Sequence, residues 1–241
     1  MTTRTGYVVP GDDVLVPHER IPPAYRAVMT LAAPIVRWWG RLEVVGADVL
    51  PASGAALLIA NHDSAWDPLI LGVAAMPRRQ LRALAKSSLW RAPPAAWLLD
   101  QMGQIPIERG RFDTQALAVA IEALRAGACV GIFPEGTVSR GQPLRPLSGA
   151  GRLALSAPGA PVICASVSGA VDVVRFPKRP QIRVEFFPPS GGPPRPGETA
   201  VGLTKRTMAE VRDRAPFAVP GRRRKAAEFR RLAAEAASPR P

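Results

Sequence analysis

The sequence predicts a single α/β domain in which a mixed, largely parallel sheet is flanked by helices. Short apolar runs of strand length alternate along the chain with stretches whose apolar residues recur at helical spacing, a pattern typical of layered α/β folds. The length of 241 residues suffices for one domain with a substantial core. We place this domain at residues 23–215, after an N-terminal arm (1–22) and before a basic tail (216–241).

An N-terminal amphipathic helix is expected at about residues 23–40. Pro34 bends or divides this helix, because proline lacks the backbone donor that a helix interior needs. Trp38 and Trp39 directly follow Arg37, and paired tryptophans beside arginine suit the headgroup level of a membrane. The alternative interpretation is an amphipathic helix that packs on the core.

The remaining elements are expected to alternate between strands and helices. Strands are predicted at 41–46, 55–60, 81–86, 105–108, 128–133, 161–167 and 181–187, and helices at 68–76, 90–102, 112–126, 149–156 and 199–214. The helix at 112–126 has a clear beginning and end, because Asp113 can cap it and Gly127 can terminate it.

Charge narrows the class of partner. A formal net charge of +13 and a pI near 11.3 predict an anionic partner. Nucleic acid is unlikely, since aromatic residues make up only 6% of the chain and no nucleic-acid-binding module is recognisable. An anionic membrane surface or a phosphorylated substrate fits at least as well as nucleic acid. The tail from residue 219 carries seven basic and two acidic side chains, which suits anionic lipid.

The sequence gives little support for a reactive cysteine, a metal site, a membrane-spanning helix or a signal peptide. Cys129 and Cys164 lie in apolar runs where buried, inert thiols are expected, and no metal site is predicted. The early apolar run at 27–36 is far shorter than the ~20 residues that span a bilayer, and the N-terminus lacks a signal-peptide pattern. We therefore expect a peripheral protein on the cytoplasmic face of the cell membrane.

The stretch at 59–68, IANHDSAWDP, has the strongest pattern of the chain. His62 is expected on the turn between a strand and a helix, with Asp67 in the first helical turn, so that the carboxylate reaches back to the imidazole. Such a pair suits a general base held by an orienting acid. Asp63 or Ser64 is expected to cap this helix. The alternative is that the aspartate only caps the helix and that His62 only satisfies local backbone groups.

The pattern Asn-His-x-Ser-x-x-Asp resembles the first motif of the glycerolipid acyltransferases, the family of 1-acylglycerol-3-phosphate acyltransferases. The resemblance implies that His62 deprotonates the hydroxyl of an acceptor lipid and that Asp67 orients His62. The segment IPIER (105–109) resembles the second motif, whose arginine, here Arg109, contacts the phosphate of the acceptor.

Two later segments extend this resemblance. FPEGT (133–137) resembles the third motif, which is assigned to acceptor binding, and APVI (160–163) resembles the start of the fourth. The family often has arginine directly after the threonine of the third motif, whereas this chain has Val138. The residues expected to bind substrate are Lys86, Arg109, Glu135, Gly136, Thr137 and Arg140.

The expected reaction is direct acyl transfer from acyl-CoA or acyl-carrier protein to a lysophospholipid hydroxyl. The expected acceptor is 1-acylglycerol-3-phosphate, which would give phosphatidic acid, and no cofactor beyond the thioester donor is implied. Alternatives are another lyso-lipid or hydroxy-lipid acceptor, a hydrolase that uses Ser64 as nucleophile, and a basic lipid- or nucleic-acid-binding protein with an inactive acyltransferase fold.

Overall fold

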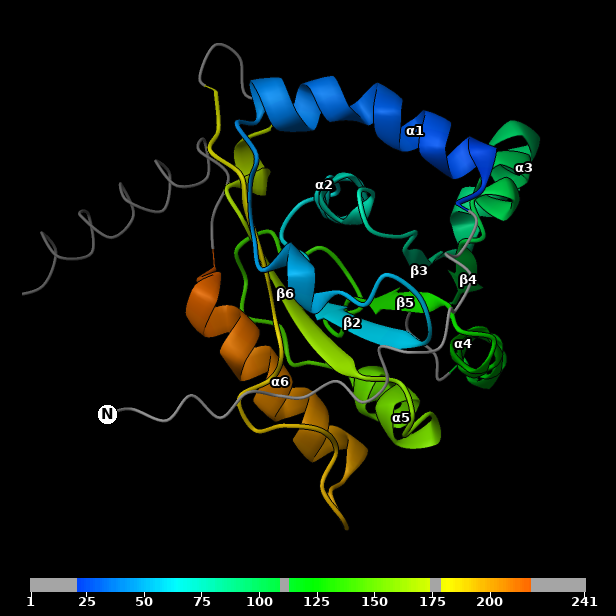
Figure 1. Cartoon of the computed structure of the whole chain (residues 1–241), viewed down its shortest axis with the longest axis vertical. Helices are drawn as coiled ribbons and strands as arrows, with labels where there is room; N and C mark the ends of the chain where they lie inside the picture. The colour runs from blue at the N-terminus through cyan, green and yellow to red at the C-terminus, as the bar shows by residue number, and fades with distance from the viewer. Residues whose placement is uncertain (1–20, 109–112, 174–178, 218–241) are drawn as a thin grey trace, which may run out of the picture.

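Seven strands form one sheet in the order β1-β7-β6-β2-β5-β3-β4 (Figure 1). The computed structural model describes residues 21–108, 113–173 and 179–217. The strands are β1 (Glu43–Val45), β2 (Ala56–Ala60), β3 (Arg82–Lys86), β4 (Ile105–Ile107), β5 (Cys129–Ile132), β6 (Val162–Ser168) and β7 (Arg183–Phe187). The strands from β2 to β6 run parallel, whereas β7 is antiparallel to β6 and carries β1 parallel to itself. The predicted mixed, largely parallel sheet is confirmed.

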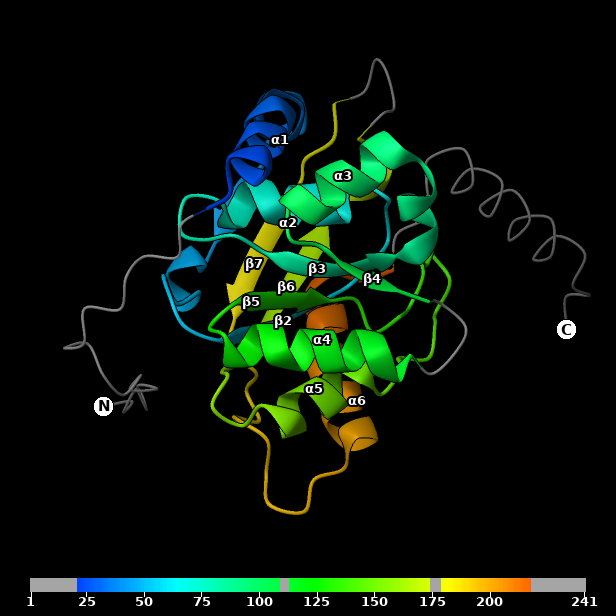
Figure 2. The ribbon, with the colours of Figure 1, turned by 90° about the vertical axis from the view of Figure 1, so that its right-hand side faces the viewer.

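Helices cover both faces of the sheet. They are α1 (Pro23–Ala33), α2 (Asp67–Ala75), α3 (Pro93–Gln101), α4 (Thr114–Arg125), α5 (Gly149–Ser156) and α6 (Ala200–Arg214), with short helical turns at Pro34–Trp39, Ala47–Val49, Ser87–Arg91 and Ala170–Asp172. Figures 1 and 2 show α1, α2 and α3 over one face and α4, α5 and α6 under the other. The domain therefore has three layers.

The strand β2 lies at the centre of both cores. All five of its residues are buried, and successive side chains point to opposite faces of the sheet. Leu58 packs with Ile70 in the core under α1 and α2, whereas Leu57 and Ile59 pack with Leu153 in the core over α4, α5 and α6. Because both faces of β2 are buried, its sequence is an unbroken run of apolar residues and does not alternate between apolar and polar residues.

The N-terminal helix divides at Pro34 as predicted. The helix α1 ends at Ala33, and a π-helical turn continues from Pro34 to Trp39. The two tryptophans differ in environment: Trp38 is 71% exposed, whereas the partly buried Trp39 donates from Nε1 to the carbonyl of Val173 at 2.7 Å. The packing interpretation thus holds for Trp39, while Trp38 remains open to solvent.

Two helices show how local sequence determines their ends and packing. The carboxylate of Asp113 accepts from the amide of Ala116 at 2.9 Å, which confirms the predicted cap of α4. Gly151 lets α5 approach α6 closely, because a Cβ there would lie 2.0 Å from the carbonyl oxygen of Ala200. This contact fixes the position of α6 relative to the sheet.

Several predictions fall outside the described ranges. Residues 1–20 of the arm, 218–241 of the tail, and Arg109 are among them. Within the described ranges, no helix combines the length and apolar character needed to cross a membrane.

Candidate active site

The predicted site residues follow the carboxyl ends of neighbouring parallel strands. His62 comes after β2, the 133–137 motif after β5, and Lys86 is the last residue of β3. Because parallel strands end at the same edge of a sheet, these residues meet there. Gly136 adopts a φ of +68° in the turn after β5, a conformation that glycine accommodates without strain.

His62 and Asp67 form the predicted pair. Nδ1 of His62 lies 3.2 Å from Oδ2 of Asp67, which also accepts from the backbone amide of Ser64 at 2.8 Å. Asp67 is fully buried at the start of α2, and this burial raises the pKa of its carboxyl, although the hydrogen bonds from His62 and Ser64 lower it. The contact to Nδ1 leaves Nε2 as the nitrogen for proton exchange with a ligand.

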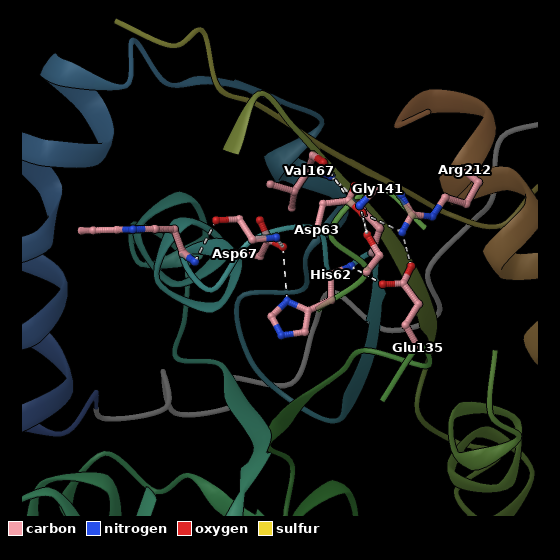
Figure 3. A network of polar contacts seen from close by, with 11 residues as sticks. His62, Asp63, Asp67, Glu135, Gly141, Val167 and Arg212 are labelled. Carbon is pink, nitrogen blue, oxygen red and sulfur yellow. Dashed lines mark hydrogen bonds and ion pairs between the residues drawn. The ribbon is translucent and has the colours of Figure 1, made fainter. Parts of the chain in front are cut away.

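Neither Asp63 nor Ser64 caps α2, so the predicted cap was wrong. The helix begins later than a cap at either position requires, with Trp66 at its N-cap and no side-chain cap hydrogen bond. The hydroxyl of Ser64 accepts from the amide of Trp66 at 3.2 Å instead. The carboxylate of Asp63 is directed away from the helix, toward Arg212 (Figure 3).

The backbone of His62 is held from two sides (Figure 3). Its amide donates to Oε2 of Glu135 at 2.8 Å, and its carbonyl accepts from the amide of Ser139 at 2.7 Å. The preceding Asn61 side chain makes two hydrogen bonds with the backbone of Val167, at 2.7 and 2.8 Å. These contacts connect the turn after β2 to both neighbouring strands.

Arg212, near the end of α6, joins the two carboxylates that flank this backbone. It donates to Asp63 from Nη1 at 2.8 Å and from Nη2 at 3.0 Å, and Nη2 also contacts Oε1 of Glu135. The hydroxyl of Ser139 donates to Asp63 as well. The sequence analysis missed Arg212, because an arginine 149 residues after Asp63 leaves no local pattern and resembles any other cation of a basic chain.

A cavity of about 410 Å³ lies between the sheet and the α1–α3 layer, beside His62. Its walls are mostly apolar, with side chains from α1, α2, α3, β2 and β3. The ring of Phe133 stacks on His62 with 4.5 Å between centroids, and Val138 and Lys86 also line the cavity. His62 therefore faces a space suited to an apolar chain.

The residues predicted to bind substrate occupy different places. Lys86 lines the cavity, whereas Thr137 and Arg140 are exposed on the loop after β5. Glu135 is buried, and its carboxylate contacts the His62 amide and Arg212. Arg109 lies outside the described residues, so its phosphate contact stays a prediction, as do the substrate roles of the others.

The two cysteines are buried on β5 and β6. Burial raises the pKa of the Cys164 thiol to about 12, so this thiol stays protonated and unreactive at neutral pH. Among the described residues, no group of three or more His, Cys, Asp or Glu side chains is placed to hold a metal ion.

Comparisons with known proteins point to one family. The family model described as "Acyltransferase" matches residues 41–168. One relative is a 1-acyl-sn-glycerol-3-phosphate acyltransferase of Borreliella burgdorferi, which is 38% identical over 42% of this chain and 40% of that protein. Another is a lyso-ornithine lipid O-acyltransferase of Pseudomonas aeruginosa, which is 35% identical over 54% of this chain and 51% of that protein. The chain thus spans about half the length of the curated relatives that it matches.

A solved structure shares the fold. The 1-acyl-sn-glycerophosphate acyltransferase PlsC from Thermotoga maritima superposes with a TM-score of 0.60 at 20% identity, over 77% of this chain and 75% of that one. The family model covers more than half of the chain and includes the His62–Asp67 motif. The chain belongs to the acyltransferase family.

Proposed function

We propose that this protein transfers a fatty acyl group from acyl-CoA or acyl-carrier protein to the hydroxyl of a lysophospholipid. The observation that carries the proposal is the buried Asp67 carboxylate 3.2 Å from Nδ1 of His62, at the wall of an apolar cavity. An imidazole held in this way is a general base whose Nε2 is directed to the ligand. The apolar cavity offers a place for an acyl chain.

The reaction needs no covalent enzyme intermediate. Nε2 of His62 takes the proton of the acceptor hydroxyl while that oxygen attacks the thioester carbonyl. The carbon–sulfur bond breaks, and the leaving thiolate takes the proton back from the imidazolium. Asp67 fixes the tautomer and stabilises the charged ring.

The first candidate acceptor is 1-acylglycerol-3-phosphate, which gives phosphatidic acid. Relatives from Borreliella burgdorferi and Bacillus subtilis carry the name of this activity. Lys86 at the cavity wall and Arg109 after β4 are the cations that we assign to the phosphate, with Arg140 as a third. An arginine offers a planar fork for two phosphate oxygens.

A second candidate acceptor is a lyso-ornithine lipid, the substrate in the name of the Pseudomonas aeruginosa relative. The observation that favours it is Val138, an apolar residue that lines the cavity where the family often has arginine. Among the described residues that line the cavity, Lys86 is the one cation. A headgroup without phosphate needs fewer cations at this wall.

A panel of acceptors and donors tests the function. Purified protein should release thiol from radiolabelled acyl-CoA or acyl-carrier protein only when a lyso-acceptor is added. We expect Val138→Arg to raise the use of lysophosphatidate relative to lyso-ornithine lipid. Absence of acceptor-dependent thiol release with both donors contradicts the function, and a burst of acyl-enzyme without acceptor supports the hydrolase alternative with Ser64.

We further propose that the protein lies on the anionic, cytoplasmic face of the membrane. Around α1, the large apolar side chains of Leu31, Ile35 and Trp38 are exposed, which suits insertion at the headgroup level. The basic tail beyond residue 218 adds attraction to anionic lipid.

Vesicle binding tests this placement. Trp38→Ala should weaken partitioning onto phosphatidylglycerol vesicles about tenfold, because a large apolar side chain no longer leaves water. The control is Val119→Ala, which removes an exposed apolar side chain of α4 in the opposite layer and should change nothing. Binding should also fall at high salt. Equal binding to neutral vesicles at low salt contradicts the electrostatic part, and an unchanged Trp38→Ala variant contradicts the role of α1.

A further inference from the structure

We propose that Arg212 is a positioning residue for acyl transfer: it holds the two buried carboxylates of Asp63 and Glu135 together and thereby fixes the backbone of His62. The inference rests on the proposed function, since it assigns Arg212 a part in the same site. Arg212 is not among the residues that line the cavity, whereas His62 is. Arg212 therefore influences a ligand in the cavity through the position of His62.

The geometry links Arg212 to His62 along two routes. Asp63 is the next residue in the chain after His62, and Glu135 accepts the His62 amide at 2.8 Å. The guanidinium contacts both carboxylates, with both oxygens of Asp63 within 3.0 Å of its two terminal nitrogens (Figure 3). Such a planar fork fixes the direction of its partners as well as their distance. A shift of either carboxylate therefore moves the turn that carries the imidazole.

The charges require a cation at this point. The side chains of Asp63 and Glu135 are 5% and 1% exposed, and two buried carboxylates repel unless a positive charge lies between them. Asp67 places a third carboxylate on the far side of Asp63, beside His62. Burial raises the pKa of Glu135, while the charge of Arg212 and the His62 amide lower it. Without Arg212, no positive charge would oppose the effect of burial on the pKa of Glu135, so we expect Glu135 to take up a proton more readily.

The position of Arg212 is itself determined by packing. Its guanidinium stacks on the ring of Phe217 at 3.9 Å, and Nη1 also donates to the carbonyl of Ala215 at 3.3 Å. The close contact at Gly151 holds α6 against α5. The cation therefore comes from a well-packed helix rather than from a free surface side chain.

Kinetics of three variants test the proposal. Arg212→Gln should lower kcat roughly 100-fold, the order expected when a reacting group is misplaced by about 1 Å, with the KM of both substrates changed less than about threefold. Arg212→Lys should lower kcat by a smaller factor, because one ammonium cannot replace the planar fork. The control is Arg214→Gln on the same helix, which loses a half-exposed pair with Glu185 and should retain wild-type kcat.

The pH profile separates positioning from a general loss of folded protein. In Arg212→Gln, activity should decline as the pH rises, because Glu135, whose pKa is raised by burial, then loses its proton and carries a buried charge without a partner. Arg212→Lys keeps the positive charge and should retain the wild-type profile. A loss of activity that is equal at every pH, together with an equal loss of folded protein, overturns the proposal.

A readout without turnover separates this inference from the proposed function. The chain has two histidines, so the ring Cε1–Hε1 NMR signals can be assigned with His62→Ala. Arg212→Gln and Arg212→Lys should shift the His62 signal, whereas Arg214→Gln should not. If the wild type transfers no acyl group but the signal shifts, only the proposed function fails. A folded Arg212→Lys or Arg212→Gln protein with wild-type kcat and an unshifted signal overturns the role of Arg212.

Discussion

The His62→Ala variant is expected to lose about 10²–10⁴-fold in kcat for acyl transfer, the typical contribution of a general base. Alanine removes the nitrogen that accepts the hydroxyl proton but leaves the backbone contacts to Glu135 and Ser139 available. The fold should therefore persist. Steady-state kinetics with the best acceptor of the panel, together with circular dichroism and thermal unfolding, measure both parts of this expectation.

The other histidine provides the matched control. His18 belongs to the N-terminal arm, outside the described residues, and His18→Ala should retain wild-type kcat. Near-normal turnover in purified His62→Ala protein contradicts the general-base mechanism. Comparable losses in both histidine variants also contradict it, because they indicate an effect unrelated to the His62–Asp67 pair.

Asp67→Asn is expected to lower kcat by about 10–100-fold although it changes few atoms. One oxygen of Asp67, Oδ2, contacts both Nδ1 of His62 and the amide of Ser64, so the amide oxygen of asparagine can take its place and keep both contacts. The proton of the neutral imidazole then stays on Nδ1. What the variant loses is the negative charge that stabilises the imidazolium formed during the reaction.

Kinetics and NMR together test this expectation. The tautomer of His62 can be read from its ring ¹⁵N shifts, which should still place the proton on Nδ1 in Asp67→Asn. Asp48→Asn, an exposed aspartate in the turn after β1, is the control and should match the wild type. A folded Asp67→Asn protein with unchanged kcat contradicts the role of the Asp67 charge in stabilising the imidazolium.

The elements that sequence predicted best are those with strong local signals. The unbroken apolar run of β2 and the capped, periodic helix α4 appear within a residue or two of the expected ends. The contact between His62 and Asp67 was predicted from a turn between a strand and a helix, and the structure contains this turn between β2 and α2. These features depend on residues a few positions apart, so the sequence records them directly.

Other features depend on tertiary contacts. The cap expected at Asp63 was wrong because its carboxylate binds Arg212, far along the chain, and not the start of α2. The segment at 90–102 divides into a 3-10 turn and the shorter α3. The contact of Glu135 with Arg212 joins residues 77 positions apart, and nothing in the local sequence distinguishes Arg212 from other arginines.

Asp63 and Arg212 are 149 residues apart in the sequence, so the site cannot be completed until late in the synthesis of the chain. During synthesis, the segment with His62 and Asp67 exists well before the last turn of α6 is made. Asp63 and Glu135 can remain hydrated until α6 docks, since burying them earlier would leave two charges without a cation. Contacts of such high sequence separation form late and slowly. The turn that carries the imidazole thus becomes rigid only when the final helix of the described domain is in place, and any defect in the docking of α6 is transmitted to the catalytic centre.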